Sequence, residues 1–208
     1  MVQGRVTAPR EESLNVFPRT REDRENEFRI ARELGLKAIE WLFYFPDKEK
    51  NPIFSRDGIQ EIHHLRSAYN IAIPSLLGLY FIERGFKGSD AASSIAILNR
   101  LIAKCAKRKI SKIVVPFFEA NAIENEDDKN EYVKNLVPCL AFAKQKGIRL
   151  IFEAPLPAEE LKEFIARFEN DSLRVIYDTG NMTTVLGEKV PHDIQTLGPL
   201  IESVHIKD

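Results

Sequence analysis

Short apolar runs alternate with longer segments of helical periodicity along the chain. The runs are rich in β-branched and aromatic residues, whereas the segments between them place apolar residues three and four positions apart. This alternation predicts βα units and an α/β fold. The predicted strands cover residues 2–6, 38–43, 71–80, 112–117, 149–153, 174–178 and 203–206.

The later runs indicate a parallel sheet. The sequences KIVVPF, RLIFE and RVIYD are continuously apolar in their middles instead of alternating, as in strands that are covered on both faces. Tyr132, Leu136 and Leu140 mark the apolar face of one intervening helix. Gly35 and Gly147 each stand between a helical segment and a strand, where a left-handed residue commonly ends a helix.

Two architectures fit this order, an open doubly wound sheet and a (β/α)8 barrel. An open dinucleotide-binding sheet would carry GxGxxG after its first strand, but Gly4 is followed by RVT. A step of 35 residues from Arg5 to Glu40 favours the barrel. Because such a barrel has eight units and about 250 residues, we predict one TIM-barrel domain over residues 1–208, truncated after the seventh strand and lacking the last helix–strand–helix portion. The alternative is that the sequence is a fragment.

Composition and charge exclude several classes. The 208 residues are 44% hydrophobic and 29% charged, which is typical of a globular protein. Lys and Arg total 30 against 31 Asp and Glu, so the net charge of −1 disfavours a nucleic-acid partner. No apolar run approaches the roughly 20 residues that span a bilayer, and the first residues do not resemble a signal peptide. We therefore expect a cytoplasmic protein with no membrane partner.

Polar residues at strand ends carry the candidate chemistry, because the active site of a parallel barrel lies at the carboxyl ends of its strands. Glu153 ends RLIFE, Asp178 ends RVIYD, and His205 lies in the last strand. Each alone has a structural explanation, as a helix-start charge, a turn residue or a partly buried histidine. Together they form an oxygen and nitrogen ligand set suited to Mn²⁺, Zn²⁺, Co²⁺ or Mg²⁺.

Three further residues are candidates for substrate binding. Glu40 could bind a substrate hydroxyl, or it could only pair with Arg5. Arg5 on the first strand could contact an anion, with a surface strand end as the alternative. Lys207 follows His205 near the end of the sequence.

At this point the chain resembles a known family. The matching phrases are QGR at 3–5, ELGLKAIEW at 33–41, IFEAP around Glu153, YDTGN at 177–181 and VHIKD at 204–208. Together they resemble the sugar phosphate isomerase/epimerase family with the xylose isomerase-like TIM barrel, and within it the hexulose-6-phosphate isomerase and xylulose-5-phosphate 3-epimerase type.

The resemblance implies a divalent metal held by Glu153, Asp178 and His205, with a fourth ligand, a glutamate of an eighth strand, that has no counterpart in this sequence. It implies proton abstraction beside the carbonyl of a ketose or ketose phosphate, with Glu153 as ligand and acid/base and the metal stabilising the enediolate. Catalysis would be impaired if the chain ends at Asp208. Exposed edges of the first and seventh strands would then favour a homo-oligomer.

Two other functions are weighed against this one. A barrel remnant without catalysis could act as a binding or assembly protein. An apurinic endonuclease of the same superfamily would need more metal-binding histidines at strand ends than His205 and a charge better suited to DNA.

Overall fold

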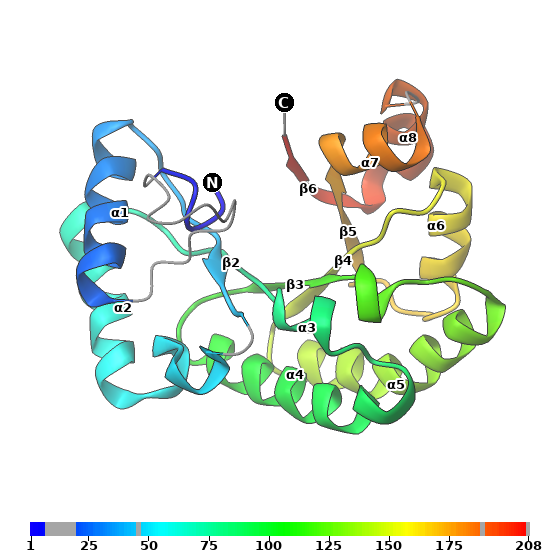
Figure 1. Cartoon of the computed structure of the whole chain (residues 1–208), viewed down its shortest axis with the longest axis horizontal. Coiled ribbons are helices and arrows are strands. Elements are labelled where there is room, and N and C mark those ends of the chain that lie inside the picture. The colour runs from blue at the N-terminus through cyan, green and yellow to red at the C-terminus, as the bar shows by residue number, and fades with distance from the viewer. Residues whose placement is uncertain (7–19, 45–46, 188–189, 207–208) are drawn as a thin grey trace.

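The computed structural model describes residues 1–6, 20–44, 47–187 and 190–206. Within these residues, six parallel strands lie side by side in the order in which they occur in the chain. They form an open half-barrel with the helices on its outer side (Figure 1). The strands are β1 (Trp41–Leu42), β2 (Ser75–Leu77), β3 (Lys112–Pro116), β4 (Arg149–Glu153), β5 (Arg174–Asp178) and β6 (Ile201–His205).

Helices connect successive strands, as the sequence predicts, so every connection is a βα unit. The α-helices are α1 (Arg21–Glu33), α2 (Arg56–Tyr69), α3 (Tyr80–Glu83), α4 (Ala91–Ala106), α5 (Glu126–Gln145), α6 (Ala158–Ala166), α7 (Thr179–Leu186) and α8 (Val190–Leu197). Short 3-10 helices occur at η1 (Asp47–Lys50), η2 (Pro52–Phe54), η3 (Gly88–Asp90), η4 (Glu119–Asn121) and η5 (Gly198–Leu200). In the described residues, no helix has the length and apolarity that crossing a membrane requires.

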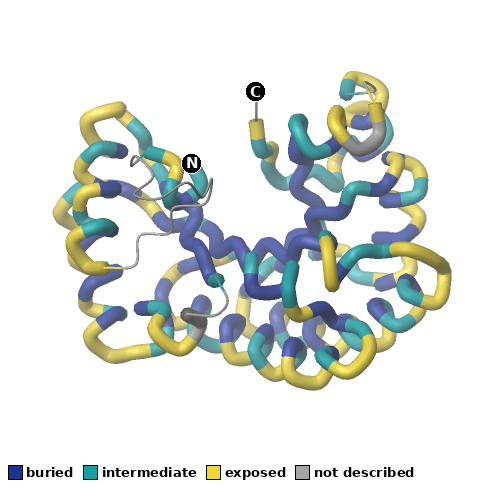
Figure 2. Tube along the Cα trace, in the orientation of Figure 1, coloured by how far each residue is buried: buried dark blue, intermediate teal, exposed yellow. Residues whose placement is uncertain are grey.

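The main core lies between the outer face of the sheet and the helices. Residues of β1 to β5 are mostly buried, whereas β6 is only partly buried and the solvent side of the helices is exposed (Figure 2). Phe117, Phe152 and Phe164 pack edge-to-face or tilted against one another, at centroid distances of 4.9 to 6.5 Å. Cys105 and Cys139 are buried free thiols in this core.

The inner face of the half-barrel carries a second, smaller apolar cluster. It consists of one residue from each of the first five strands: Leu42, Leu77, Val114, Ile151 and Ile176. Because side chains alternate across a strand, the residues two positions further along β4 and β5 also point inward. These residues are Glu153 and Asp178, which brings both carboxylates to the concave side.

The predicted strand at 2–6 is wrong in its length. Only Val2 forms a parallel bridge, to Glu40, with backbone hydrogen bonds on either side of it. Gly4 then takes a left-handed φ of 84° and donates its N–H to the Glu27 carboxylate of α1. The backbone therefore leaves the sheet at Gly4, although Val2 occupies the place of a first barrel strand beside β1.

The predicted strand at 71–80 is also shorter in the structure. Ala72 forms an isolated bridge to Ala38, while regular pairing begins only at Ser75. Pro74 lies between them and has no N–H to donate. At the other end, Tyr80 is already the first residue of α3. The half-barrel nevertheless matches the predicted α/β class and the truncated TIM-barrel type.

Candidate metal centre

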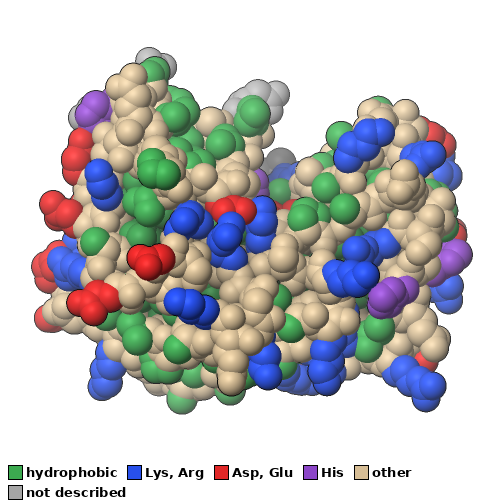
Figure 3. All heavy atoms as spheres, turned by 180° about the vertical axis from the view of Figure 1, so that it is seen from behind, with side chains coloured by type: hydrophobic (Ala, Val, Ile, Leu, Met, Phe, Trp, Pro, Cys, Tyr) green, Lys and Arg blue, Asp and Glu red, His purple; other side chains and the backbone are tan. Residues whose placement is uncertain are grey.

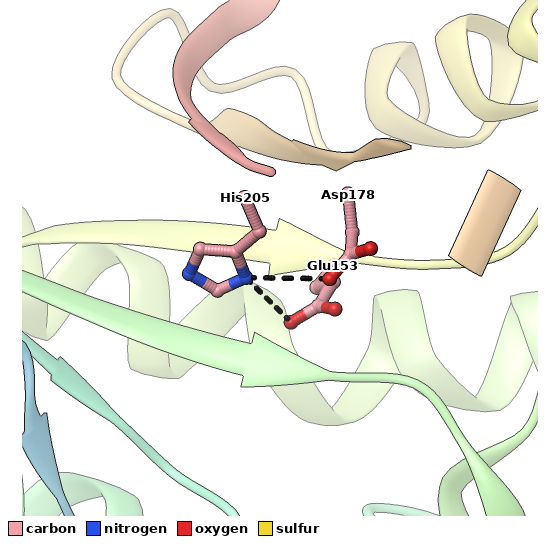
Figure 4. A group of neighbouring side chains, drawn as sticks. All are labelled: Glu153, Asp178 and His205. Carbon is pink, nitrogen blue, oxygen red and sulfur yellow. Dashed lines mark ion pairs between the residues drawn. The ribbon is translucent and has the colours of Figure 1, made fainter. Parts of the chain in front are cut away.

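Glu153, Asp178 and His205 come together at the carboxyl end of the sheet, from three neighbouring strands (Figure 4). One ligand atom from each lies within 4.8 Å of the others. His205 Nδ1 is 3.6 Å from Asp178 Oδ2 and 4.0 Å from Glu153 Oε2. Both carboxylates are buried and the histidine is partly buried. The structure thus brings together the three residues that the sequence singles out as metal ligands.

Asn181 links the two carboxylates and was not assigned a role from the sequence. Asp178 is the N-cap of α7, and its Oδ1 accepts the Asn181 backbone N–H at 2.8 Å. The Asn181 side-chain Nδ2 donates to Glu153 Oε1 at 3.1 Å. The signal that could have found it is the DTGN turn, which puts an amide three residues after a capping aspartate.

The second nitrogen of His205 points away from Glu153 and Asp178. Nε2 lies 3.0 Å from Glu40 Oε2, a contact between residues 165 positions apart in the chain. The other oxygen of Glu40, Oε1, accepts a hydrogen bond from the Ser75 hydroxyl at 2.6 Å. Ser75, like Asn181, was not selected from the sequence, since a serine at the start of an apolar strand carries no distinctive pattern.

The carboxylates around His205 favour its charged form. Burial of the imidazole lowers its pKa, but the contacts with Asp178 and Glu40 raise it more strongly. The Glu153 charge acts in the same direction, and the pKa of His205 is raised from 6.5 to about 9. A cation that binds through Nδ1 at neutral pH therefore has to displace a proton.

The donor set fits a divalent metal ion. Two carboxylates and an imidazole supply oxygen and nitrogen ligands of the kind that Mg²⁺, Mn²⁺, Co²⁺ and Zn²⁺ accept. Their ligand atoms converge within 4.8 Å from three strands of one sheet, so that one ion could contact all three. Three protein ligands leave coordination positions open for substrate oxygens.

The concave face forms a cavity of about 1320 Å³ beside this centre. Glu40, Glu153 and His205 line it, and so does Arg5, which is exposed. Glu40 contacts Ser75 and His205. The sequence predicts neither contact, since it suggests a substrate hydroxyl or Arg5 as the partner of Glu40. Lys207 lies outside the described residues.

Comparison with known proteins identifies the family. The profile described as "Xylose isomerase-like TIM barrel" matches residues 28–208. No curated protein matches the chain. Solved structures do match, at identities that show the fold alone.

Three of these structures illustrate the match. A xylose isomerase-like TIM barrel protein from Mycobacterium smegmatis in complex with magnesium has a TM-score of 0.75 at 16% identity, covering 91% of this chain and 67% of its own. A D-psicose 3-epimerase from Clostridium cellulolyticum H10 with D-tagatose gives 0.74 at 16%, covering 89% and 68%. An L-ribulose 3-epimerase gives 0.73 at 17%, covering 91% and 66%. With the family profile spanning nearly all of its elements, this chain belongs to the xylose isomerase-like TIM barrel family.

Proposed function

We propose that the chain is a divalent-metal-dependent isomerase or epimerase that acts on a ketose or ketose phosphate. The observation that carries this proposal is the convergence of Glu153, Asp178 and His205 on the concave face, beside a cavity large enough for a sugar. Similar structures that are described as a D-psicose 3-epimerase and an L-ribulose 3-epimerase support the substrate class.

In this proposal the three side chains hold the metal and Glu153 also moves the proton. The metal, when bound, supplies a Lewis acid that orients substrate oxygens and stabilises negative charge on them. Glu153 removes a proton from the carbon beside the carbonyl, and the Asn181 amide keeps its carboxylate in place. Arg5 and Lys207 remain predicted substrate contacts, with Arg5 suited to an anionic group.

The stereochemical outcome depends on how many proton-transfer groups face the substrate. An isomerase can move one proton between adjacent carbons with a single group on one face of the intermediate. An epimerase needs a second group on the opposite face, because the proton must return with inversion. Within the described residues, Glu153 is the group to which we assign proton transfer, and both reactions begin with its removal of that proton.

The decisive experiment combines metal content with proton exchange. Elemental analysis compares the wild type with Glu153→Gln, Asp178→Asn and His205→Ala, and with Glu83→Gln as a control that removes a carboxylate elsewhere in the cavity lining. The same proteins are incubated with D-psicose, D-tagatose, D-ribulose and their phosphates in deuterated water. We expect metal in the wild type and the control, loss of metal in the three variants, and metal-dependent deuterium incorporation beside the carbonyl.

Each other result has a distinct meaning. A wild type without metal and without deuterium incorporation would contradict the proposal and favour the non-catalytic binding protein. Metal retained in all three variants would place the metal elsewhere and refute this ligand set.

A further inference from the structure

The two ring nitrogens of His205 face different surroundings. Nδ1 lies near the carboxylates of Asp178 and Glu153, at 3.6 and 4.0 Å. Nε2 lies 3.0 Å from Glu40 Oε2 on the opposite side of the ring. Nδ1 is therefore the nitrogen that a metal between these carboxylates would contact. Nε2 then carries the ring proton and donates a hydrogen bond to Glu40.

Glu40 is itself held in place as an acceptor. The Ser75 hydroxyl donates to its Oε1 at 2.6 Å, so one oxygen faces Ser75 and the other faces His205. The side chains of His205 and Glu40 are only 16% and 10% exposed, and Ser75 is buried. In such a poorly solvated place a hydrogen bond to a charged acceptor is strong and holds a single geometry.

We infer that Glu40 is a positioning residue of the metal centre, which holds the proton of His205 on Nε2 and presents Nδ1 as the ligand, with Ser75 orienting Glu40. This inference rests on the proposed function, because it assumes that His205 binds a metal. It differs from the role that the sequence suggests for Glu40, a contact to a substrate hydroxyl.

The physical reason is that a neutral imidazole has one donor and one acceptor nitrogen, and the partner of the donor decides which is which. A carboxylate behind the donor also raises the basicity of the ligand nitrogen. Loss of such a partner typically weakens metal binding 10- to 100-fold. Glu40 thus acts on the metal through His205 without reaching it.

The test measures Zn²⁺ affinity by competition with a chelating dye, without any substrate. We expect binding to be about 10- to 100-fold weaker in Glu40→Ala. The amide oxygen of Glu40→Gln can still accept a hydrogen bond from the Nε2–H of His205, so this variant should lose clearly less affinity than Glu40→Ala. Ser75→Ala should lose less than Glu40→Ala as well. Glu83→Gln, which removes a carboxylate from the same cavity lining, is the matched control and should bind Zn²⁺ as the wild type does.

A second readout follows the proton itself. In the Zn²⁺-loaded wild type, NMR of the histidine side chains should show a slowly exchanging Nε2–H for His205, and the Glu40→Ala variant should lose it. Glu40→Gln and Ser75→Ala keep the test valid if Glu40→Ala does not fold.

The outcomes separate this inference from the proposed function. If the wild type binds no Zn²⁺, both fail. If the wild type binds Zn²⁺, loses it in His205→Ala and keeps full affinity in both Glu40 variants, only the role of Glu40 is refuted. If those Glu40 variants instead show a raised KM for a ketose at unchanged Zn²⁺ affinity, Glu40 is a substrate contact.

Discussion

The side-chain amide of Asn181 donates a hydrogen bond to Oε1 of Glu153 at 3.1 Å. We predict that Asn181→Ala weakens Zn²⁺ binding by about tenfold, because the Glu153 carboxylate loses a partner that fixes its orientation. The α7 cap should survive, since Asp178 accepts the backbone N–H of residue 181 and not its side chain. Dye competition measures the affinity, and thermal unfolding shows whether stability is retained.

Thr184→Ala is the control for this prediction. Thr184 is an exposed residue of the same helix, one turn nearer its end. It should bind Zn²⁺ as the wild type does. Equal affinities in Asn181→Ala and Thr184→Ala would show that Asn181 does not position Glu153.

A second prediction concerns the ion pairs at the other end of the strands. Basic side chains gather in the middle of the face seen from behind (Figure 3). Glu202 of β6 contacts Lys112 at 2.7 Å and also pairs with Arg149. Burial raises the pKa of the Glu202 carboxyl, but these two cations lower it more. The ion pairs therefore tie β6 to β3 and β4.

We expect Glu202→Gln to lower the free energy of unfolding by about 1–2 kcal/mol at pH 7, because the pairs are partly exposed. The folded pKa is depressed, so the stabilisation is present above the unfolded pKa and is lost as the pH falls through the folded value. Urea unfolding at several pH values should show the difference between variant and wild type shrinking below about pH 4.5. Exposed Glu163→Gln is the control, and a pH-independent difference would contradict the prediction.

A third prediction concerns Glu27, a fully buried carboxyl of α1 that accepts the N–H of Gly4. Burial raises its pKa from 4.5 to about 7 and outweighs that hydrogen bond. Between these values the folded chain holds a proton that the unfolded chain releases. Its contribution to stability is therefore complete at low pH and declines as the pH rises towards 7, by about 3 kcal/mol in total.

Glu27→Gln should remove this decline, because the amide does not titrate. Chemical unfolding of wild type and variant at half-unit steps between pH 5 and 8 gives the difference that isolates residue 27 from other groups. The variant should gain stability relative to the wild type as the pH rises. Parallel curves would show that Glu27 keeps an ordinary pKa.

A fourth prediction concerns Gly58 in the first turn of α2. A Cβ at this position would overlap the backbone oxygen and Cα of Pro52 in η2. An alanine normally stabilises a helix by about 1 kcal/mol over glycine, but here the overlap should reverse the sign. Gly58→Ala should destabilise the protein by about 1–3 kcal/mol, seen as a lower Tm. Ser67→Ala, exposed in the same helix, should raise or keep the Tm.

The strands that the sequence predicts best are those covered on both faces. The predicted strands at 149–153 and 174–178 agree with β4 and β5. A short uninterrupted apolar run is typical of a parallel strand that is covered on both faces. The run at 71–80 is equally apolar, but Pro74 and the start of α3 limit its pairing. At the amino end, Gly4 turns the backbone towards Glu27, a tertiary contact that the local pattern does not contain.

The same distinction applies to the candidate site. Glu153 and Asp178 could be predicted because each ends a buried strand, and neighbouring strand ends converge in any parallel sheet. The Glu40–His205 contact could not, because it depends on the curvature of the whole sheet. Glu40 precedes β1, whereas His205 ends β6, and only the curvature and strand tilt of the half-barrel bring these two distant strand ends together.

That contact has a consequence for how the protein folds. Each strand pairs with the next one along the chain, so the sheet can form one strand at a time, and each addition closes only the connection between two consecutive strands. The bond between residues 40 and 205 closes a loop of 165 positions and forms only when all six strands are in place. A metal ion that needs His205 held by Glu40 would therefore bind after the last strand docks. Because the metal would bind only after the last strand docks, its binding would slow unfolding more than it would speed folding.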